Sequence, residues 1–140
     1  MTLPDAGRTT TGRVQPPGWK APIGYSHGVV ASGRVITLAG QIGWNPTTGE
    51  LESDNFAQQA TQALRNIVAV LAAAGAKPEH LVRLTWFITN RDEYLRTTKE
   101  VGANYRDIIG GHFPAMSVVV VSALLEARAQ VEIEATAVVP

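Results

Sequence analysis

Two carboxylates near the C-terminal end of the sequence, Glu132 and Glu134, lie in a segment whose hydrophobicity alternates with period two. Successive side chains of a strand point to opposite faces, so the alternation over residues 131–139 places both carboxylates on one face and the apolar side chains on the other. Covering a carboxylate costs free energy unless the group is paired or hydrogen bonded. We therefore expect these carboxylates to be solvated, paired across an interface, or used as a general acid or base.

The composition limits the classes of protein that the chain can represent. Its 140 residues, 45% of them hydrophobic, are enough for one compact core and too few for two ordinary domains. A formal net charge of zero without a basic block argues against nucleic acid and membrane surfaces as partners. The absence of cysteine excludes disulfides and a thiol nucleophile. Because no membrane span or export signal is recognisable, we expect a cytoplasmic protein.

The N-terminal part of the chain differs in composition from the rest. Residues 1–22 are rich in Pro, Gly, Thr and Arg and show no hydrophobic periodicity. This composition predicts a flexible N-terminal arm without a packed element, in which Trp19 is the only large anchor. Residues 23–140 are predicted to form a single domain.

Within this domain the pattern predicts the element order β-β-α-β-α-β-β. The first two strands, residues 25–31 and 34–40, are joined by a two-residue turn and are expected to form a hairpin. The next element is a helix from Phe56 to Ala74, with Ser53 or Asp54 as its cap and Gly75 after its end. A strand over 80–89 follows, and then a helix from Asn90 to Ile108 that is capped by Asn90 with Glu93. Two strands, over 116–123 and 130–139, end the domain. Two helices on one face of a mixed sheet leave the other face open, so we expect an oligomer to cover it.

Four short segments, together with this element order, resemble a known family. The segments are Ala39-Gly40-Gln41-Ile42, Asn45-Pro46-Thr47-Thr48-Gly49-Glu50, Phe113-Pro114-Ala115 and Glu132-Ile133-Glu134-Ala135. Residues 23–139 thereby resemble the YjgF/YER/UK family, also called the Rid (reactive intermediate/imine deaminase) family. The resemblance implies an α+β, chorismate-mutase-like fold and a homotrimer whose sheets form a central barrel with three clefts between neighbouring subunits. Its best-known branch hydrolyses enamines or imines such as 2-aminoacrylate, and no cofactor is implied.

The resemblance also assigns roles to individual positions. The family's active-site tyrosine falls on Tyr25, its cleft glycine on Gly40 and its water-handling glutamate on Glu132. The position of its substrate-binding arginine is occupied by Met116. A guanidinium holds a carboxylate with two charge-assisted hydrogen bonds, whereas methionine offers an apolar surface. We therefore expect a small 2-imino acid to bind poorly.

Neighbouring positions make the predicted cleft more apolar than in the deaminase branch. Ala39 stands where the family usually has a serine, and Val118 stands where it has a cysteine. Trp44, which follows the strand of Gly40, is expected to add an aromatic wall to the substrate site. These differences favour a larger or ring-derived substrate, similar to the 2-aminomuconate that an arginine-lacking branch of the family deaminates.

A structural role competes with a functional one for several residues. Glu132 is either a general acid or base or a solvated strand residue, and Glu134 is assigned a structural pairing role. Tyr25 either contacts substrate or water or is an interface aromatic. Four arginines could replace the missing cation, although each is more simply a surface charge: Arg34, Arg83, Arg106 and Arg128. The histidines have no metal-ligand spacing, so no metal site is expected.

Three functions remain open at this point. The first is a hydrolytic deaminase of an enamine or imine metabolite, in which Glu132 handles water in an intersubunit cleft while Tyr25 assists and Gly40 frames the pocket. The alternative is a non-catalytic trimeric small-molecule-binding or regulatory protein, which the loss of the arginine favours. Endoribonuclease activity, attached to some family members, has the least support because the chain is neutral.

Overall fold

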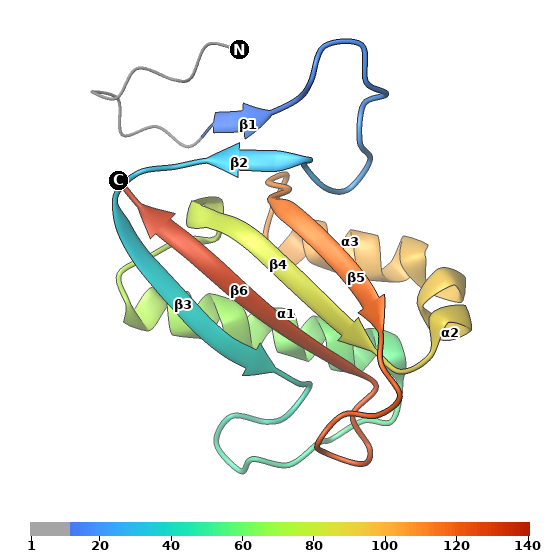
Figure 1. Cartoon of the computed structure of the whole chain (residues 1–140). Helices are drawn as coiled ribbons and strands as arrows, with labels where there is room; N and C mark the ends of the chain where they lie inside the picture. Colours follow the sequence, from blue (N-terminus) through green and yellow to red (C-terminus); the bar gives the residue numbers. More distant parts are fainter. Residues whose placement is uncertain (1–11) are drawn as a thin grey trace.

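The computed structural model describes residues 12–140 and contains one four-stranded mixed sheet with helices on a single face (Figure 1). The strand order is β3-β6-β4-β5, comprising β3 (Arg34–Gln41), β6 (Val131–Val139), β4 (Leu81–Ile88) and β5 (Ala115–Val120). Strand β6 runs antiparallel to both of its neighbours, and β5 runs parallel to β4. The predicted strands of the sheet are therefore present, with bounds shifted by one to three residues.

The core lies between the sheet and the long helix α1 (Phe56–Ala73), which contacts β3, β6 and a second helix, α3 (Thr98–Ile108). The buried side chains of α1 recur at three- and four-residue spacing, as an amphipathic helix requires. They include Phe56, Ala60, Ala63, Leu64, Ile67 and Leu71. A single 3₁₀ turn, η1 (Pro78–His80), leads into β4. The hydrophobic periodicity of the sequence therefore predicted α1 correctly.

Local hydrogen bonds set the ends of α1. The side chain of Asn55 accepts a hydrogen bond from the backbone N–H of Gln58, so the predicted cap at Ser53 or Asp54 is wrong. Asn55 takes the cap position because it directly precedes the first helical residue, and Asn is among the best cap residues. Gly75 has a φ of 75°, the left-handed conformation predicted for the residue after the helix.

The predicted helix from Asn90 to Ile108 is divided into α2 (Arg91–Arg96) and α3 at Thr97. The hydroxyl of Thr97 donates a hydrogen bond to the carbonyl of Glu93 over 2.7 Å, which holds the residue at the junction. Asn90 caps α2 by accepting a hydrogen bond from the N–H of Glu93 over 3.0 Å, as predicted. The prediction of one continuous helix is wrong. The apolar residues keep their helical spacing on both sides of Thr97, so the spacing alone does not reveal that the helix axis changes direction there.

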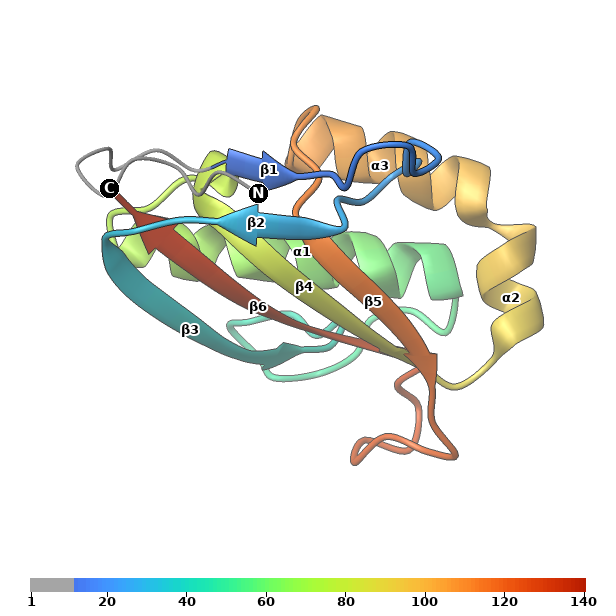
Figure 2. The same cartoon turned by 45° about the horizontal axis from the view of Figure 1, so that its top comes forward.

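Two short strands near the N-terminus form a separate two-stranded sheet beside the end of the main sheet at which β4 and β5 begin (Figures 1 and 2). In it, β1 (Gly12–Val14) pairs antiparallel with β2 (Gly28–Val30). The predicted hairpin between residues 25–31 and 34–40 is therefore wrong. Strand β3 pairs instead with β6, which is an antiparallel partner far longer than β2.

The predicted N-terminal arm, residues 1–22, falls partly outside the described residues. In its described part, β1 contradicts the prediction of an arm without a packed element. Three residues of sequence Gly-Arg-Val carry too little alternation to reveal a strand, and the partner that orders them is distant in sequence. The division into an arm and a domain over 23–140 stays a prediction, and residues 1–11 lie beyond what the structure describes.

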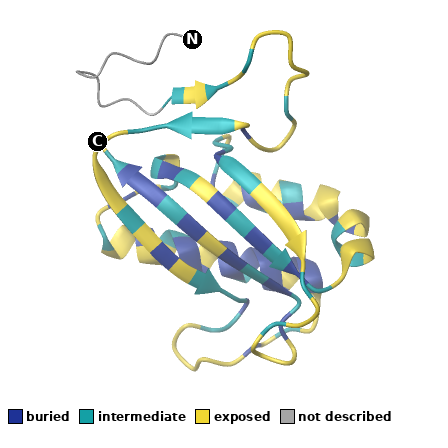
Figure 3. Ribbon diagram, viewed as in Figure 1, coloured by how far each residue is buried: buried dark blue, intermediate teal, exposed yellow. Residues whose placement is uncertain are grey.

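Residues of different burial alternate along the strands of the main sheet (Figure 3), because successive side chains point to opposite faces. In β6, Ile133 and Ala135 are buried toward the helices, while Glu132 is half-buried and Glu134 is exposed on the opposite face. This confirms the alternation predicted from the sequence. We call the surface away from the helices the open face. It also carries Val35, which is 63% exposed.

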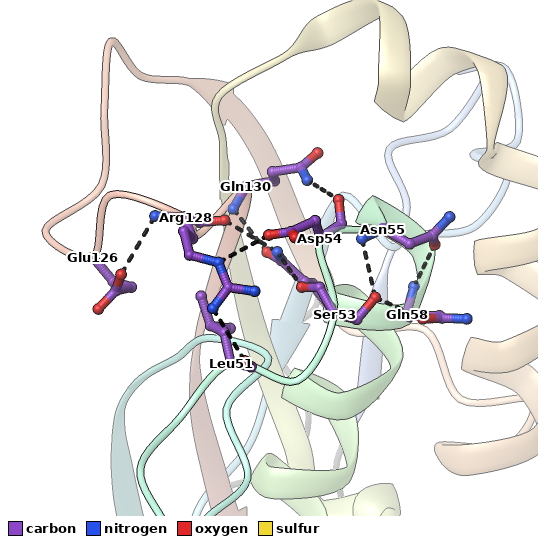
Figure 4. A network of polar contacts seen from close by, with 9 residues as sticks. Leu51, Ser53, Asp54, Asn55, Gln58, Glu126, Arg128 and Gln130 are labelled. Atoms are coloured by element: carbon purple, nitrogen blue, oxygen red, sulfur yellow. Dashed lines mark hydrogen bonds and ion pairs between the residues drawn. The ribbon is translucent and has the colours of Figure 1, made fainter.

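A buried glutamine, Gln59, ties the start of α1 to the start of β6. Its hydrogen-bond partners Ser53, Arg128 and Gln130 belong to the polar network of Figure 4. Gln59 is 1% exposed, and its Nε2 donates hydrogen bonds to the carbonyls of Ser53 and Arg128 over 2.9 and 3.1 Å. Its Oε1 accepts from the N–H of Gln130 over 2.8 Å. The guanidinium of Arg128 also pairs with Asp54 over 2.9 Å. These bonds fix the loop before β6 against the helix.

We expect Gln59→Leu to lower the free energy of unfolding by about 3 kcal/mol or more, because three backbone groups lose their partner at about 1–3 kcal/mol each. Urea denaturation followed by circular dichroism measures the change. The matched control is Gln58→Leu at the exposed neighbouring position, for which we expect a loss below about 1 kcal/mol. Equal losses in the two variants would contradict the role assigned to Gln59.

Candidate functional site

Three of the predicted site residues line one hollow at the end of β3 and the start of β6. This cavity of about 310 Å³ has Gly40, Trp44 and Glu132 in its wall, and the loop residues 124–126 complete it. We call it the carboxylate pocket. Because Glu132 lies on a strand and is half-buried, its carboxylate is held at the wall of the pocket without being removed from solvent.

Glu132 and Gly40 lie in contact across the two strands. A Cβ added to Gly40 would lie 2.6 Å from Oε1 and 2.8 Å from Cγ of Glu132, closer than side-chain packing allows. The pairing of β3 with β6 shifts register between Leu38 and Gln41, so the strand is irregular at Gly40. The carboxylate therefore packs on backbone that only a glycine leaves uncovered.

Trp44 is positioned by the turn that follows β3. Its indole Nε1 donates a hydrogen bond to Oε1 of Gln41 over 3.2 Å, and its backbone forms an isolated bridge with Leu51. The side chain of Asn45 accepts a hydrogen bond from the N–H of Thr47 over 2.9 Å, which closes the turn between them. The turn residues identified in the sequence thus hold one wall of the carboxylate pocket.

Three more of the predicted site residues line a second hollow on the helix side of the sheet. This cavity of about 490 Å³ lies between β5, α3 and residues 23–25, and Tyr25, Met116 and Val118 are in its wall. We call it the aromatic pocket. Its further aromatic residues are Trp86, Tyr94, Tyr105 and Phe113. The aromatic pocket is separate from Glu132 because Met116 and Val118 point to the face of the sheet opposite that of Glu132.

The segment that carries Tyr25 is fastened to the start of β5. The N–H of Ser26 donates a hydrogen bond to the carbonyl of Pro114 over 3.0 Å, and its hydroxyl donates to the carbonyl of Phe113. His27 lies edge-on to Tyr25, with ring centroids 5.3 Å apart. Tyr25 itself is 37% exposed. Tyr25 is therefore a partly exposed residue in the wall of the aromatic pocket.

Two phenols inside the aromatic pocket stay protonated at neutral pH. Burial raises the pKa of Tyr105, and the nearby guanidinium of Arg13 offsets only part of this rise. The hydroxyl of Tyr105 donates a hydrogen bond to the carbonyl of His112 over 2.7 Å. Burial also raises the pKa of Tyr94. Neither phenol is therefore suited to act as a base.

Two other predictions fall outside both pockets. Ala39 is exposed on β3 and lines neither cavity. Glu134 lies on the open face, where it lines a shallow hollow with Arg83, but neither ion pair within residues 12–140 includes it. The pairing role predicted for Glu134 is thus not fulfilled inside the described part of this chain.

The described residues form neither a cluster of metal ligands nor a membrane-spanning helix. No group of three or more His, Asp or Glu side chains in residues 12–140 is placed to hold a metal ion. None of the helices in this part of the chain is long and apolar enough to cross a membrane. The cytoplasmic location stays a prediction.

Comparisons with known proteins agree on one family. Residues 18–139 match the family described as Endoribonuclease L-PSP. The 2-iminobutanoate/2-iminopropanoate deaminase of Escherichia coli (strain K12) is 40% identical over 117 residues, which cover 81% of this chain and 86% of the relative. The human protein of the same name is 34% identical over 114 residues, covering 81% and 79%. A Yersinia pestis structure described as a protein of unknown function of the conserved Rid protein family has a TM-score of 0.79 at 34% identity and covers 92% of this chain and 98% of that chain.

The chain therefore belongs to the endoribonuclease L-PSP family, which is the YjgF or Rid family that its four short segments resemble. The predicted α+β fold is confirmed by the solved structures of this family. The relatives named as imine deaminases support a Rid-type deaminase as the class of this protein. The trimer and the role of each site residue stay predictions.

We expect Gly40→Ala to displace the Glu132 carboxylate with a stability loss below about 1 kcal/mol, because only a flexible side chain has to move. A crystal structure of the variant would show Glu132 in another rotamer, and urea denaturation would give the stability. The control is Gly111→Ala, where an added Cβ meets nothing within 4 Å. An unmoved Glu132 in the Gly40→Ala structure would contradict the contact described above.

Proposed function

We propose that this protein is a hydrolytic deaminase of an enamine or imine metabolite, with Glu132 as the residue that handles water. The observation that carries the proposal is the contact of Glu132 with Gly40 in the wall of the carboxylate pocket. A carboxylate on a rigid strand, next to uncovered backbone and a cavity, is suited to hold a water molecule beside a bound substrate. The names of the deaminase relatives give independent support.

The chemistry needs only water and one carboxyl group. Glu132 accepts a proton from water as the oxygen adds to the carbon of the C=N bond, and the nitrogen gains a proton, which gives a carbinolamine. The carbinolamine hydroxyl then loses its proton while the nitrogen is protonated again and leaves as ammonia. The net change is the addition of one water and the release of one ammonia, which leaves a ketone. An enamine enters this path after protonation at carbon.

The proposed site is incomplete in a single chain, because Glu132 and Gly40 line one pocket while Tyr25 and Met116 line another. We propose that the carboxylate pocket of one copy faces the aromatic pocket of the next in a homotrimer, with three such clefts. A head-to-tail contact that closes after three copies joins two different surfaces in this way. The exposed apolar side chain of Val35 on the open face is consistent with a surface that a neighbouring copy covers.

The aromatic pocket supports a substrate larger than 2-aminoacrylate. Met116 is half-buried and packs against the hydrophobic core, so the family's arginine position contributes a flexible apolar wall. Together with Tyr25 and Val118 it would contact the carbon skeleton of the substrate. A conjugated or ring-derived imine such as 2-aminomuconate matches these walls better than a three-carbon acid.

A second function is favoured by one specific observation, which is the absence of a cation at position 116 in an otherwise well-formed cavity. A trimeric small-molecule-binding or regulatory protein could keep both pockets without turnover. The family takes its name from an endoribonuclease, but the net charge of zero gives that activity no electrostatic support.

We expect the purified protein to release ammonia from 2-aminomuconate and much less from enzymatically generated 2-aminoacrylate. Glu132→Gln should lower the rate by at least about a hundredfold, the usual contribution of a general acid or base. The matched control is Glu134→Gln, two residues along the same strand face, which should keep most of the activity.

Each outcome of this assay has a distinct meaning. Equal loss in the two variants would contradict the role of Glu132. Fast release from 2-aminoacrylate would show that the argument from Met116 is wrong. Binding of 2-aminomuconate without release would favour the regulatory protein.

A further inference from the structure

Three of the four arginines that could replace the missing cation are placed elsewhere. The Nη2 of Arg34 donates a hydrogen bond to the carbonyl of Ala74 over 3.2 Å, after the end of α1. The guanidinium of Arg128 is paired with Asp54 over 2.9 Å. Arg83 lies on the open face of the sheet. None of these three lines the aromatic pocket.

The fourth, Arg106, lines the aromatic pocket with Met116 and Tyr25. It comes from α3, on the wall that faces β5. Its Nη1 and Nη2 would lie 3.8 and 3.9 Å from a Cβ built on Gly102, one helical turn earlier. Because Gly102 has no side chain, the space beside the guanidinium is open. Neither of the two ion pairs formed in the described part of the chain includes Arg106.

A second polar group of the same pocket also has no partner. Trp86 lines the cavity, is 3% exposed and carries the one buried side-chain polar atom without a hydrogen bond within residues 12–140, its indole Nε1. Buried donors are nearly always hydrogen bonded in folded proteins, so an unpartnered one in the wall of a cavity points to an acceptor that is supplied from elsewhere. A ligand with an oxygen or nitrogen acceptor would satisfy it.

We propose that Arg106 binds the substrate carboxylate in this protein and thereby replaces the cation that is absent at Met116. The inference rests on the proposed deaminase function and names its substrate class, which is a planar unsaturated or aromatic carboxylate. The guanidinium binds the carboxylate with two parallel hydrogen bonds. The flat carbon skeleton lies against Met116 and the tyrosine rings, and the indole of Trp86 is available to a polar atom of the ligand.

The position of the Arg106 guanidinium explains why the proposed substrate is larger than 2-aminoacrylate. In 2-aminoacrylate the carboxylate is attached to the carbon that water attacks, so a cation on β5 would hold it next to the reacting centre. Arg106 stands on the opposite wall of the pocket, on α3. A carboxylate bound there leaves the width of the cavity for the carbon skeleton, which selects substrates whose acidic group is remote from the C=N bond.

The test uses benzoate and its uncharged analogue benzamide as probes, titrated calorimetrically into wild-type protein, Arg106→Gln and the matched control Lys99→Gln. Lys99 is exposed on the same helix and does not line the pocket. We expect Arg106→Gln to weaken benzoate binding by at least about tenfold, since a hydrogen-bonded charge pair is lost, and to leave benzamide binding unchanged. Lys99→Gln should match wild type, and Arg106→Lys should retain part of the benzoate affinity.

The inference is overturned if wild-type protein does not bind benzoate, if it binds benzoate no better than benzamide, or if the two charge-removing variants behave alike. Because binding is measured without turnover, the result is independent of the deaminase assay. Ammonia release with an unchanged KM in Arg106→Gln would leave the deaminase standing and remove the role of Arg106. Selective loss of benzoate in a protein that releases no ammonia would establish the carboxylate site and reject the deaminase.

Discussion

The close packing of the Glu132 carboxylate on the backbone of Gly40 is the constraint to which the rest of the site is fitted. It requires β3 and β6 to be neighbours, a register shift beside Gly40, and a glycine at the point of contact. The loop before β6 has to be fixed as well, which the hydrogen bonds of the buried Gln59 achieve. Strand pairing and the hydrogen bonds of one buried amide thus fix the position of this carboxylate.

Strand geometry also explains why the predicted site residues of one chain lie in two separate pockets. Alternation along β6 and β5 sends Glu132 to the open face and Met116 to the helix face, so the two side chains cannot converge within one sheet. Convergence needs the carboxylate pocket of one copy to face the aromatic pocket of another. In the homotrimer that we propose, the contact between copies would create the site, and the aromatic pocket with Arg106 would select the carboxylates that enter it.

Most features that depend on local sequence could be predicted, although the cap at Asn55 and the helix break at Thr97 were missed, and features that depend on distant partners could not be predicted. Neighbouring residues determine the helical period of α1, the left-handed conformation of Gly75, the Asn90 cap and the alternation of β6. The partner of β3, the short strand β1 and the two separate pockets depend on pairings between segments far apart in the chain. Arg106 could not be distinguished from other surface arginines by sequence because its significance arises only from the cavity that it lines.

The most direct test of the account is complementation between two inactive variants, Glu132→Gln in the carboxylate pocket and Val118→Trp in the aromatic pocket. Each variant alone should release ammonia from 2-aminomuconate at least about a hundredfold more slowly than wild type. If the half-sites come from different copies, co-expressed chains should recover up to about a quarter of wild-type activity, since one in four random head-to-tail contacts joins two intact halves. An inactive mixture that still forms mixed oligomers would contradict a site shared between subunits.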